Sequence, residues 1–177
     1  MYDRDALQAL IREHALQFGE FTLASGLQAN YYLDCRQGTL DSAGAKLIGE
    51  GMLALLGDEL PDLVGGMVIG ADPITAAILT LAGSRNIPLR GVMVRKEAKG
   101  HGTGRFVEGP FREGERLVIV EDVVTTGGSS LKAIEHCEAV GLKVERVLAI
   151  VDRLEGGHEA VSYTHLRAHE TRHDLVC

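Results

Sequence analysis

The chain has 177 residues, 45% of them hydrophobic, which suits one compact domain with a sizeable core. Its formal net charge of −7 argues against a general nucleic-acid-binding surface, and no apolar run reaches the about 20 residues that a membrane-spanning helix needs. The first residues lack the regions of a signal peptide, and the three cysteines have neither metal-ligand nor disulfide-framework spacing. We therefore expect a protein of the reducing cytoplasm.

Apolar periodicity divides the sequence into alternating helices and strands. This alternation predicts an α/β fold with a mostly parallel central sheet flanked by helices, in which ligands bind at the carboxyl ends of the strands. In chain order, the expected elements are a helix over 2–18 that ends at Gly19, two short strands on either side of Ser25-Gly26, a helix over 42–56 capped by Asp41 or Ser42, a strand over 63–70, a helix over 72–83, a strand over 89–95, a polar loop over 96–109, a strand over 116–121, a helix over 129–140 and a strand over 144–152.

The last 17 residues differ in character from the rest. They contain His-Glu-Thr-Arg-His at 169–173, which formally matches a helical zinc motif, but the motif lacks a third ligand and a scaffold. One permitted codon reading of 161–171 resembles a transposase adapter used in sequencing libraries. We therefore assign residues 1–160 to one domain and interpret 161–177 as a non-native tail, a translated adapter sequence.

Two adjacent carboxylates, Glu121 and Asp122, follow an apolar strand and precede a loop rich in hydroxyls and glycine. Paired carboxylates match the two hydroxyl donors of a sugar diol. The loop can turn backbone N–H groups inward around an anion, and the next helix points its positive end at the same place. Solvated turn residues and a simple N-cap at Ser129 are the alternative interpretation. The residues of this loop are Val123, Val124, Thr125, Thr126, Gly127, Gly128 and Ser129.

A local group of cations stands out in this acidic chain. Arg95, Lys96, Lys99, His101 and Arg105 lie close together in the polar loop. On composition alone, such a run is a solvated charged loop. Beside a phosphate-binding loop, it also suits a diphosphate leaving group, whose charge needs cations as the bond breaks.

These motifs carry a family resemblance over nearly all of residues 1–160. The Glu-Asp-Val-Val-Thr-Thr-Gly-Gly-Ser stretch resembles the 5-phosphoribosyl 1-diphosphate (PRPP) signature of the type I phosphoribosyltransferases. The Arg-Lys-Glu-Ala-Lys-Gly-His-Gly loop, the Phe-Gly-Glu-Phe-Thr-Leu-Ala-Ser-Gly segment and Ala-Ile-Val-Asp-Arg resemble orotate phosphoribosyltransferase. The resemblance implies a type I phosphoribosyltransferase fold with a small hood over 1–40, and transfer of phosphoribose from PRPP to orotate with Mg²⁺, giving orotidine 5'-phosphate and diphosphate.

The same resemblance implies roles for individual residues and a homodimer with shared active sites. PRPP would be bound by the loop 121–129 and by Arg95, Lys96, Lys99 and His101, the last two reaching across the dimer. Lys99, His101 and Asp122 would be the catalytic residues, with no direct protein ligand to the metal. Orotate would contact Thr125, Arg153, Tyr31 and Tyr32. Packing within a strand remains an alternative for the tyrosines, and a surface salt bridge remains one for Arg153.

The sequence also departs from the family pattern. Ala24 stands where many members have lysine, and the loop 70–75 lacks their Tyr-Lys pair. Two other functions stay open: a phosphoribosyltransferase for another base, and a non-catalytic PRPP-binding regulator. The first would lack the combined basic loop and hood, and the second should carry a DNA-binding segment.

Overall fold

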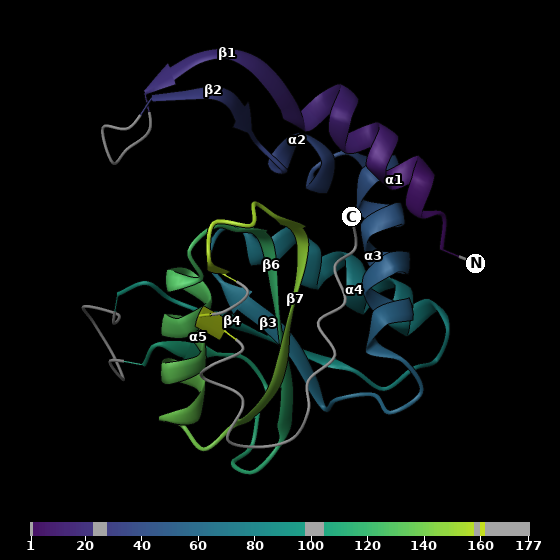
Figure 1. Cartoon of the computed structure of the whole chain (residues 1–177). Coiled ribbons are helices and arrows are strands. Elements are labelled where there is room, and N and C mark those ends of the chain that lie inside the picture. Colours follow the sequence, from purple (N-terminus) through teal and green to yellow (C-terminus); the bar gives the residue numbers. More distant parts are fainter. Residues whose placement is uncertain (1, 23–27, 98–104, 158–159, 162–177) are drawn as a thin grey trace.

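A five-stranded sheet with the order β5-β4-β3-β6-β7 forms the centre of the protein (Figure 1). The computed structural model describes residues 2–22, 28–97, 105–157 and 160–161. Neighbouring strands are parallel except for β5, which pairs antiparallel with β4. The strands are β3 (Leu63–Met67), β4 (Arg90–Val94), β5 (Val107–Glu108), β6 (Arg116–Val124) and β7 (Lys143–Asp152).

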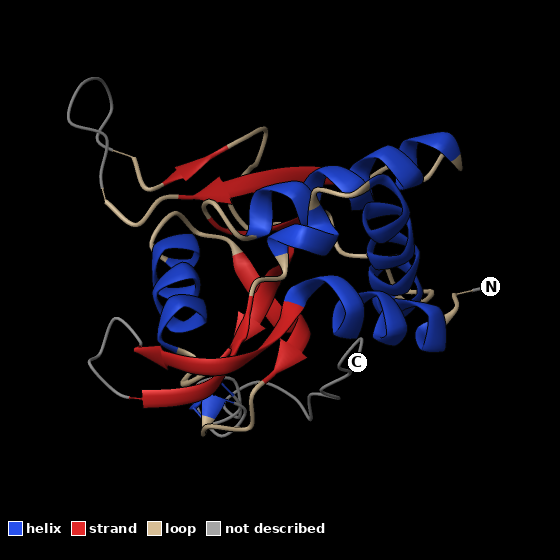
Figure 2. Cartoon of the chain, turned by 90° about the horizontal axis from the view of Figure 1, so that it is seen from above, coloured by secondary structure: helices blue, strands red, loops and turns tan. Residues whose placement is uncertain are grey.

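Helices cover both faces of this sheet, as the α/β prediction requires (Figures 1 and 2). On one face, α1, α3 and α4 enclose a core with Val64, Val118 and Leu148. On the other face, α5 packs over Leu63, Ile119 and Val147. The bounds are α1 (Arg4–Leu10), α3 (Ser42–Leu56), α4 (Ala71–Ser84) and α5 (Gly128–Glu138), and Asp41 is the N-cap of α3.

The central strand β3 is buried throughout and contains Gly65 and Gly66. A Cβ atom on either residue would collide with a carbonyl oxygen, that of Val92 beside Gly65 and that of Val120 beside Gly66. Only glycine therefore fits these two positions without moving a neighbouring strand.

A separate two-stranded hairpin lies above the carboxyl ends of the central strands (Figure 1). It consists of β1 (Leu16–Thr22) and β2 (Gln28–Leu33) and is flanked by the π-helix η1 (Ile11–Ala15) and the short helix α2 (Arg36–Thr39). The prediction that one helix runs to Gly19 is wrong. Helical structure ends at Ala15, and Leu16 instead pairs with Leu33 of β2. The apolar period is also interrupted there, since Phe18 is 82% exposed.

Two further differences concern element ends. Strand β6 continues through Asp122 to Val124 rather than ending at Glu121, because β7 pairs with it up to Asp152. The predicted polar loop contains β5, which β4 holds by antiparallel pairing of Val107 with Val94. Within the described residues, no helix is long and apolar enough to cross a bilayer.

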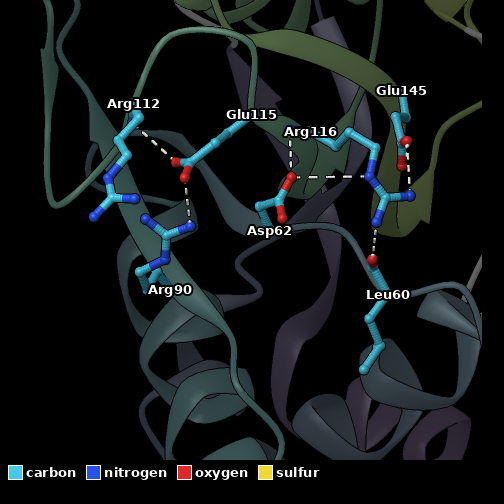
Figure 3. A network of polar contacts seen from close by, with 7 residues as sticks. All are labelled: Leu60, Asp62, Arg90, Arg112, Glu115, Arg116 and Glu145. Carbon is cyan, nitrogen blue, oxygen red and sulfur yellow. Dashed lines mark hydrogen bonds and ion pairs between the residues drawn. The ribbon is translucent and has the colours of Figure 1, made fainter.

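Charged residues tie the amino ends of the strands together, at the opposite end of the sheet from the hairpin (Figure 3). The guanidinium of Arg116 donates to the backbone oxygen of Leu60 and pairs with Glu145 at 3.3 Å, while its backbone N–H donates to Asp62. Arg90 pairs with Glu115 at 2.8 Å, and this contact lowers the pKa of the Glu115 carboxyl.

Candidate active site

A cavity of about 690 Å³ lies where β3, β4, β6 and β7 end. This is the edge of a parallel sheet at which ligands are expected. The lining comes from five segments, namely Tyr32 to Arg36, Met67 to Gly70, Arg95 to Glu97, Glu121 to Val123 with Thr125 and Ser129, and Arg153.

Glu121 and Asp122 line this cavity but have different surroundings. Glu121 is 5% exposed, and burial together with the neighbouring charge of Asp122 raises its pKa from 4.5 to about 8. Ser130 Oγ donates to Glu121 Oε1 over 3.5 Å. Asp122 is partly exposed, and its Oδ1 accepts the backbone N–H of Val123. The acidic strand end therefore offers one buried carboxyl group with a raised pKa and one partly exposed carboxyl group to a ligand.

The hydroxyl-rich loop lines a second cavity, of about 450 Å³, which shares Thr125, Ser129 and Lys96 with the first. Gly127 is the N-cap of α5 and has a left-handed backbone (φ +79°), and no side chain caps the helix. The interpretation of Ser129 as an N-cap is therefore wrong. The uncapped N–H groups at the start of α5 suit an anion, as the nest prediction required.

Two described cations of the basic loop, Arg95 and Lys96, line these cavities, whereas Arg105 lines neither. Lys96 lines both, and Arg95 lines the first and pairs with Glu108 at 2.7 Å. Residues 98–104, which include Lys99 and His101, lie outside the described residues, and so does Ala24. Among the described residues, no group of three or more His, Cys, Asp or Glu side chains could by itself hold a metal ion.

Arg153 connects the sheet with the hairpin. Its Nε donates to the hydroxyl of Tyr31 over 3.0 Å, the guanidinium lies 4.9 Å from the centre of the Tyr31 ring, and Nη2 pairs with Glu155 at 2.8 Å. The salt-bridge alternative is thus correct in part, yet Arg153 is only 17% exposed and lines the first cavity.

Consecutive residues of a strand face opposite ways, and this separates the two tyrosines. Tyr32 lines the first cavity and contacts Phe21, with 5.6 Å between ring centres. Tyr31 instead lines a neighbouring cavity of about 710 Å³, together with Glu20 and Glu155. Neither tyrosine is buried in a core, so the packing alternative does not describe them.

Several lining residues were not predicted from the sequence, among them Asp34, Arg36 and Ile69. Asp34 and Arg36 form an ion pair at 2.7 Å just after β2, which lowers the pKa of Asp34, and Ile69 is 76% exposed at the end of β3. A carboxylate two residues before an arginine, directly after a strand, is a signal that could have identified the pair. No local feature marks Ile69.

Comparison with known proteins agrees with this geometry. Residues 65–166 match the family model described as "Phosphoribosyl transferase domain", so the chain has the fold of a phosphoribosyltransferase. The chain is 58% identical to the orotate phosphoribosyltransferase of Rhodopirellula baltica over 164 residues, covering 89% of this chain and 85% of the relative, and 44% identical to that of Aquifex aeolicus, covering 91% and 90%. This chain belongs to the orotate phosphoribosyltransferase family.

Solved structures support the assignment. The orotate phosphoribosyltransferase of Mycobacterium tuberculosis in complex with PRPP has a TM-score of 0.80 and 34% identity, covering 98% of this chain and 94% of the other. Adenine phosphoribosyltransferase from Leishmania donovani, at 18% identity and a TM-score of 0.61, shares the fold. The predicted fold class and family are confirmed.

Proposed function

We propose that this protein transfers the phosphoribosyl group of PRPP to orotate, giving orotidine 5'-phosphate and diphosphate in pyrimidine nucleotide synthesis in the cytoplasm. The observation that carries the proposal is one continuous strand, loop and helix, β6 to α5, which presents two carboxylates and uncapped N–H groups to adjoining cavities. A ribose phosphate has the matching chemistry, with a diol at one end and an anion at the other.

The cavities suggest where each part of the ligands binds. The ribose hydroxyls would contact Glu121 and Asp122, and the 5'-phosphate would occupy the loop from Thr125 to Ser129. The diphosphate would lie toward Arg95 and Lys96, joined by Lys99 and His101. Orotate would then lie near Thr125 and Tyr32, with its carboxylate toward Arg153. The catalytic and binding roles predicted for these residues remain part of this proposal.

Mg²⁺ fits the donor chemistry of the site. Mg²⁺ usually keeps several waters and binds through substrate phosphates, and the partly exposed carboxylate of Asp122 lines the first cavity, so the ion would be held by the substrate beside Asp122 rather than by a dedicated protein cage. When bound, the ion would neutralise charge on the departing diphosphate.

Catalysis would then depend mainly on positioning. The transition state of glycosyl transfer resembles an oxocarbenium ion, so little covalent work falls to the protein. Asp122 and the loop 125–129 would hold the ribose in line with the orotate nitrogen, and the loop cations would stabilise the leaving group. We expect Lys99→Ala to lower kcat more than it weakens PRPP binding. A change in PRPP affinity alone, with kcat unchanged, would contradict this role.

The proposed homodimer with shared sites has a direct test. If Lys99 acts in the neighbouring subunit's site, Lys99→Ala and Asp122→Ala variants should each be inactive. A mixture of the two variants should regain activity, because one site of the mixed dimer combines an intact loop with an intact Asp122. Absence of activity in mixed dimers, isolated through a different affinity tag on each variant, would exclude sharing.

The activity itself is tested by following orotate absorbance with purified protein, PRPP and Mg²⁺. A decrease that requires all three components supports the proposal. Turnover of adenine or hypoxanthine instead would indicate another base phosphoribosyltransferase. PRPP binding by calorimetry without turnover of any base would indicate a regulator.

A further inference from the structure

We propose that Glu155 and Tyr31 are positioning residues that orient Arg153 for the carboxylate of the base. This inference rests on the proposed function. It assigns roles that differ from direct contact with the base, since both residues would act through the guanidinium.

The geometry of the guanidinium carries the inference. Arginine has five N–H donors on Nε, Nη1 and Nη2. Tyr31 accepts from Nε at 3.0 Å, and the Glu155 carboxylate forms an ion pair with Nη2 at 2.8 Å. No hydrogen bond from Nη1 occurs within the described part of the chain. These two contacts hold the guanidinium in place and leave Nη1 to donate to the carboxylate of a ligand.

The backbone around Arg153 supports a fixed arrangement. The N–H of Arg153 donates to the Val124 carbonyl at 2.9 Å, which ties it to the end of β6. Leu154 has a left-handed backbone (φ +56°), and its N–H donates to Asp152 Oδ1 at 2.8 Å. This tight turn places Glu155 beside the Arg153 side chain rather than one strand position beyond it.

The two acceptors come from different parts of the molecule. Glu155 follows β7, whereas Tyr31 belongs to the hairpin, 122 residues before Arg153 in the chain. Arg153 therefore lines both the first cavity and the one lined by Tyr31 and Glu155. Removal of either acceptor leaves Arg153 with one fewer restraint and more rotamers to lose when a ligand binds.

The test compares Glu155→Ala, Glu155→Gln and Tyr31→Phe in the full chain. We expect Glu155→Ala and Tyr31→Phe to raise the KM for orotate about tenfold, with the KM for PRPP and kcat little changed. Glu155→Gln keeps an acceptor and should lie between Glu155→Ala and the unmodified protein. Glu20→Gln is the matched control. Glu20 lines the same cavity and makes no hydrogen bond or ion pair within the described residues, so its removal should leave both KM values unchanged.

A double-variant experiment separates positioning from direct contact. If Glu155 acts through Arg153, Glu155→Ala should add nothing to the loss already caused by Arg153→Ala. Additive losses, equal increases in both KM values, or an unchanged KM for orotate would overturn the inference. Failure of the unmodified protein to use orotate would instead overturn the proposed function.

Discussion

Gly70 lies against the carboxylate of Asp122, since a Cβ atom at position 70 would come within 2.9 Å of Asp122 Oδ1. We therefore expect Gly70→Ala to displace that carboxylate and weaken PRPP binding about tenfold, as measured by calorimetry. Gly83 is the control, because it lies in α4 with open space where a Cβ would project. Gly83→Ala should stabilise the protein by up to about 1 kcal/mol and leave binding unchanged. Unaltered PRPP affinity in Gly70→Ala would show that Asp122 does not touch the ligand.

A pH-dependent stability is expected from Glu121. Its pKa is about 8 in the folded protein against an ordinary value of 4.5, so the folded state retains a proton that the unfolded chain releases between these values. Stability contributed by the protonated group is therefore complete below pH 4.5 and is lost as the pH rises toward 8.

Glu121→Gln isolates this effect. We compare the free energy of unfolding of the variant with that of the unmodified protein at pH 5 and at pH 8.5. The advantage of the variant should be larger at pH 8.5 than at pH 5, by at least about 1 kcal/mol. Denaturant unfolding at the two pH values measures the difference. A difference of the opposite sign would mean that Glu121 is ionised in the folded protein at neutral pH.

Backbone strain and phosphate binding can be separated at two glycines. Gly127 and Gly114 both have positive φ, +79° and +85°, but only Gly127 begins the helix at the proposed phosphate site. Alanine at either position should cost about 1 kcal/mol or more of stability. Only Gly127→Ala should also reduce affinity for inorganic phosphate and PRPP. Equal losses of affinity in the two variants would point to general destabilisation.

The charged network in Figure 3 should affect stability and not catalysis. Arg116 holds Leu60, Asp62 and Glu145 at the amino ends of the strands, away from the cavities. Arg116→Ala is expected to lower the free energy of unfolding by about 1–2 kcal/mol, with both KM values unchanged. The control, Arg85→Ala, breaks a longer 3.9 Å pair with Glu50 and should cost less than about 0.5 kcal/mol.

Local patterns predicted most of the fold. Apolar runs bounded by turns identified the four parallel strands, and Asp41 followed by an apolar period identified α3. The start of β1 was missed because it depends on the pairing of Leu16 with Leu33, 17 positions later. The apolar periodicity within residues 2–18 contains no information about this pairing. The two-residue strand β5 was likewise missed because it is defined by its antiparallel pairing with β4.

Part of the candidate site could likewise be predicted from local sequence, and part could not. The acidic pair and the phosphate loop are contiguous, so their order in the chain was enough to predict that they act together. The contact of Arg153 with Tyr31 spans 122 residues, and only family resemblance suggested that both serve one ligand. Opposite orientation of Tyr31 and Tyr32 follows from strand geometry, but it required knowing that 28–33 is a strand with one face toward the sheet.

The separation of the hairpin from the central sheet has a consequence for evolution and engineering. The residues proposed to bind the sugar and phosphates belong to the sheet, the loop 121–129 and α5, whereas Tyr32 and one of the two contacts of Arg153, that with Tyr31, come from the hairpin. Part of the proposed base site is thus encoded in a stretch of the gene that is separate from the proposed PRPP site. Exchange of the segment 16–33 between relatives would therefore change the surroundings of the base while the proposed donor site is retained.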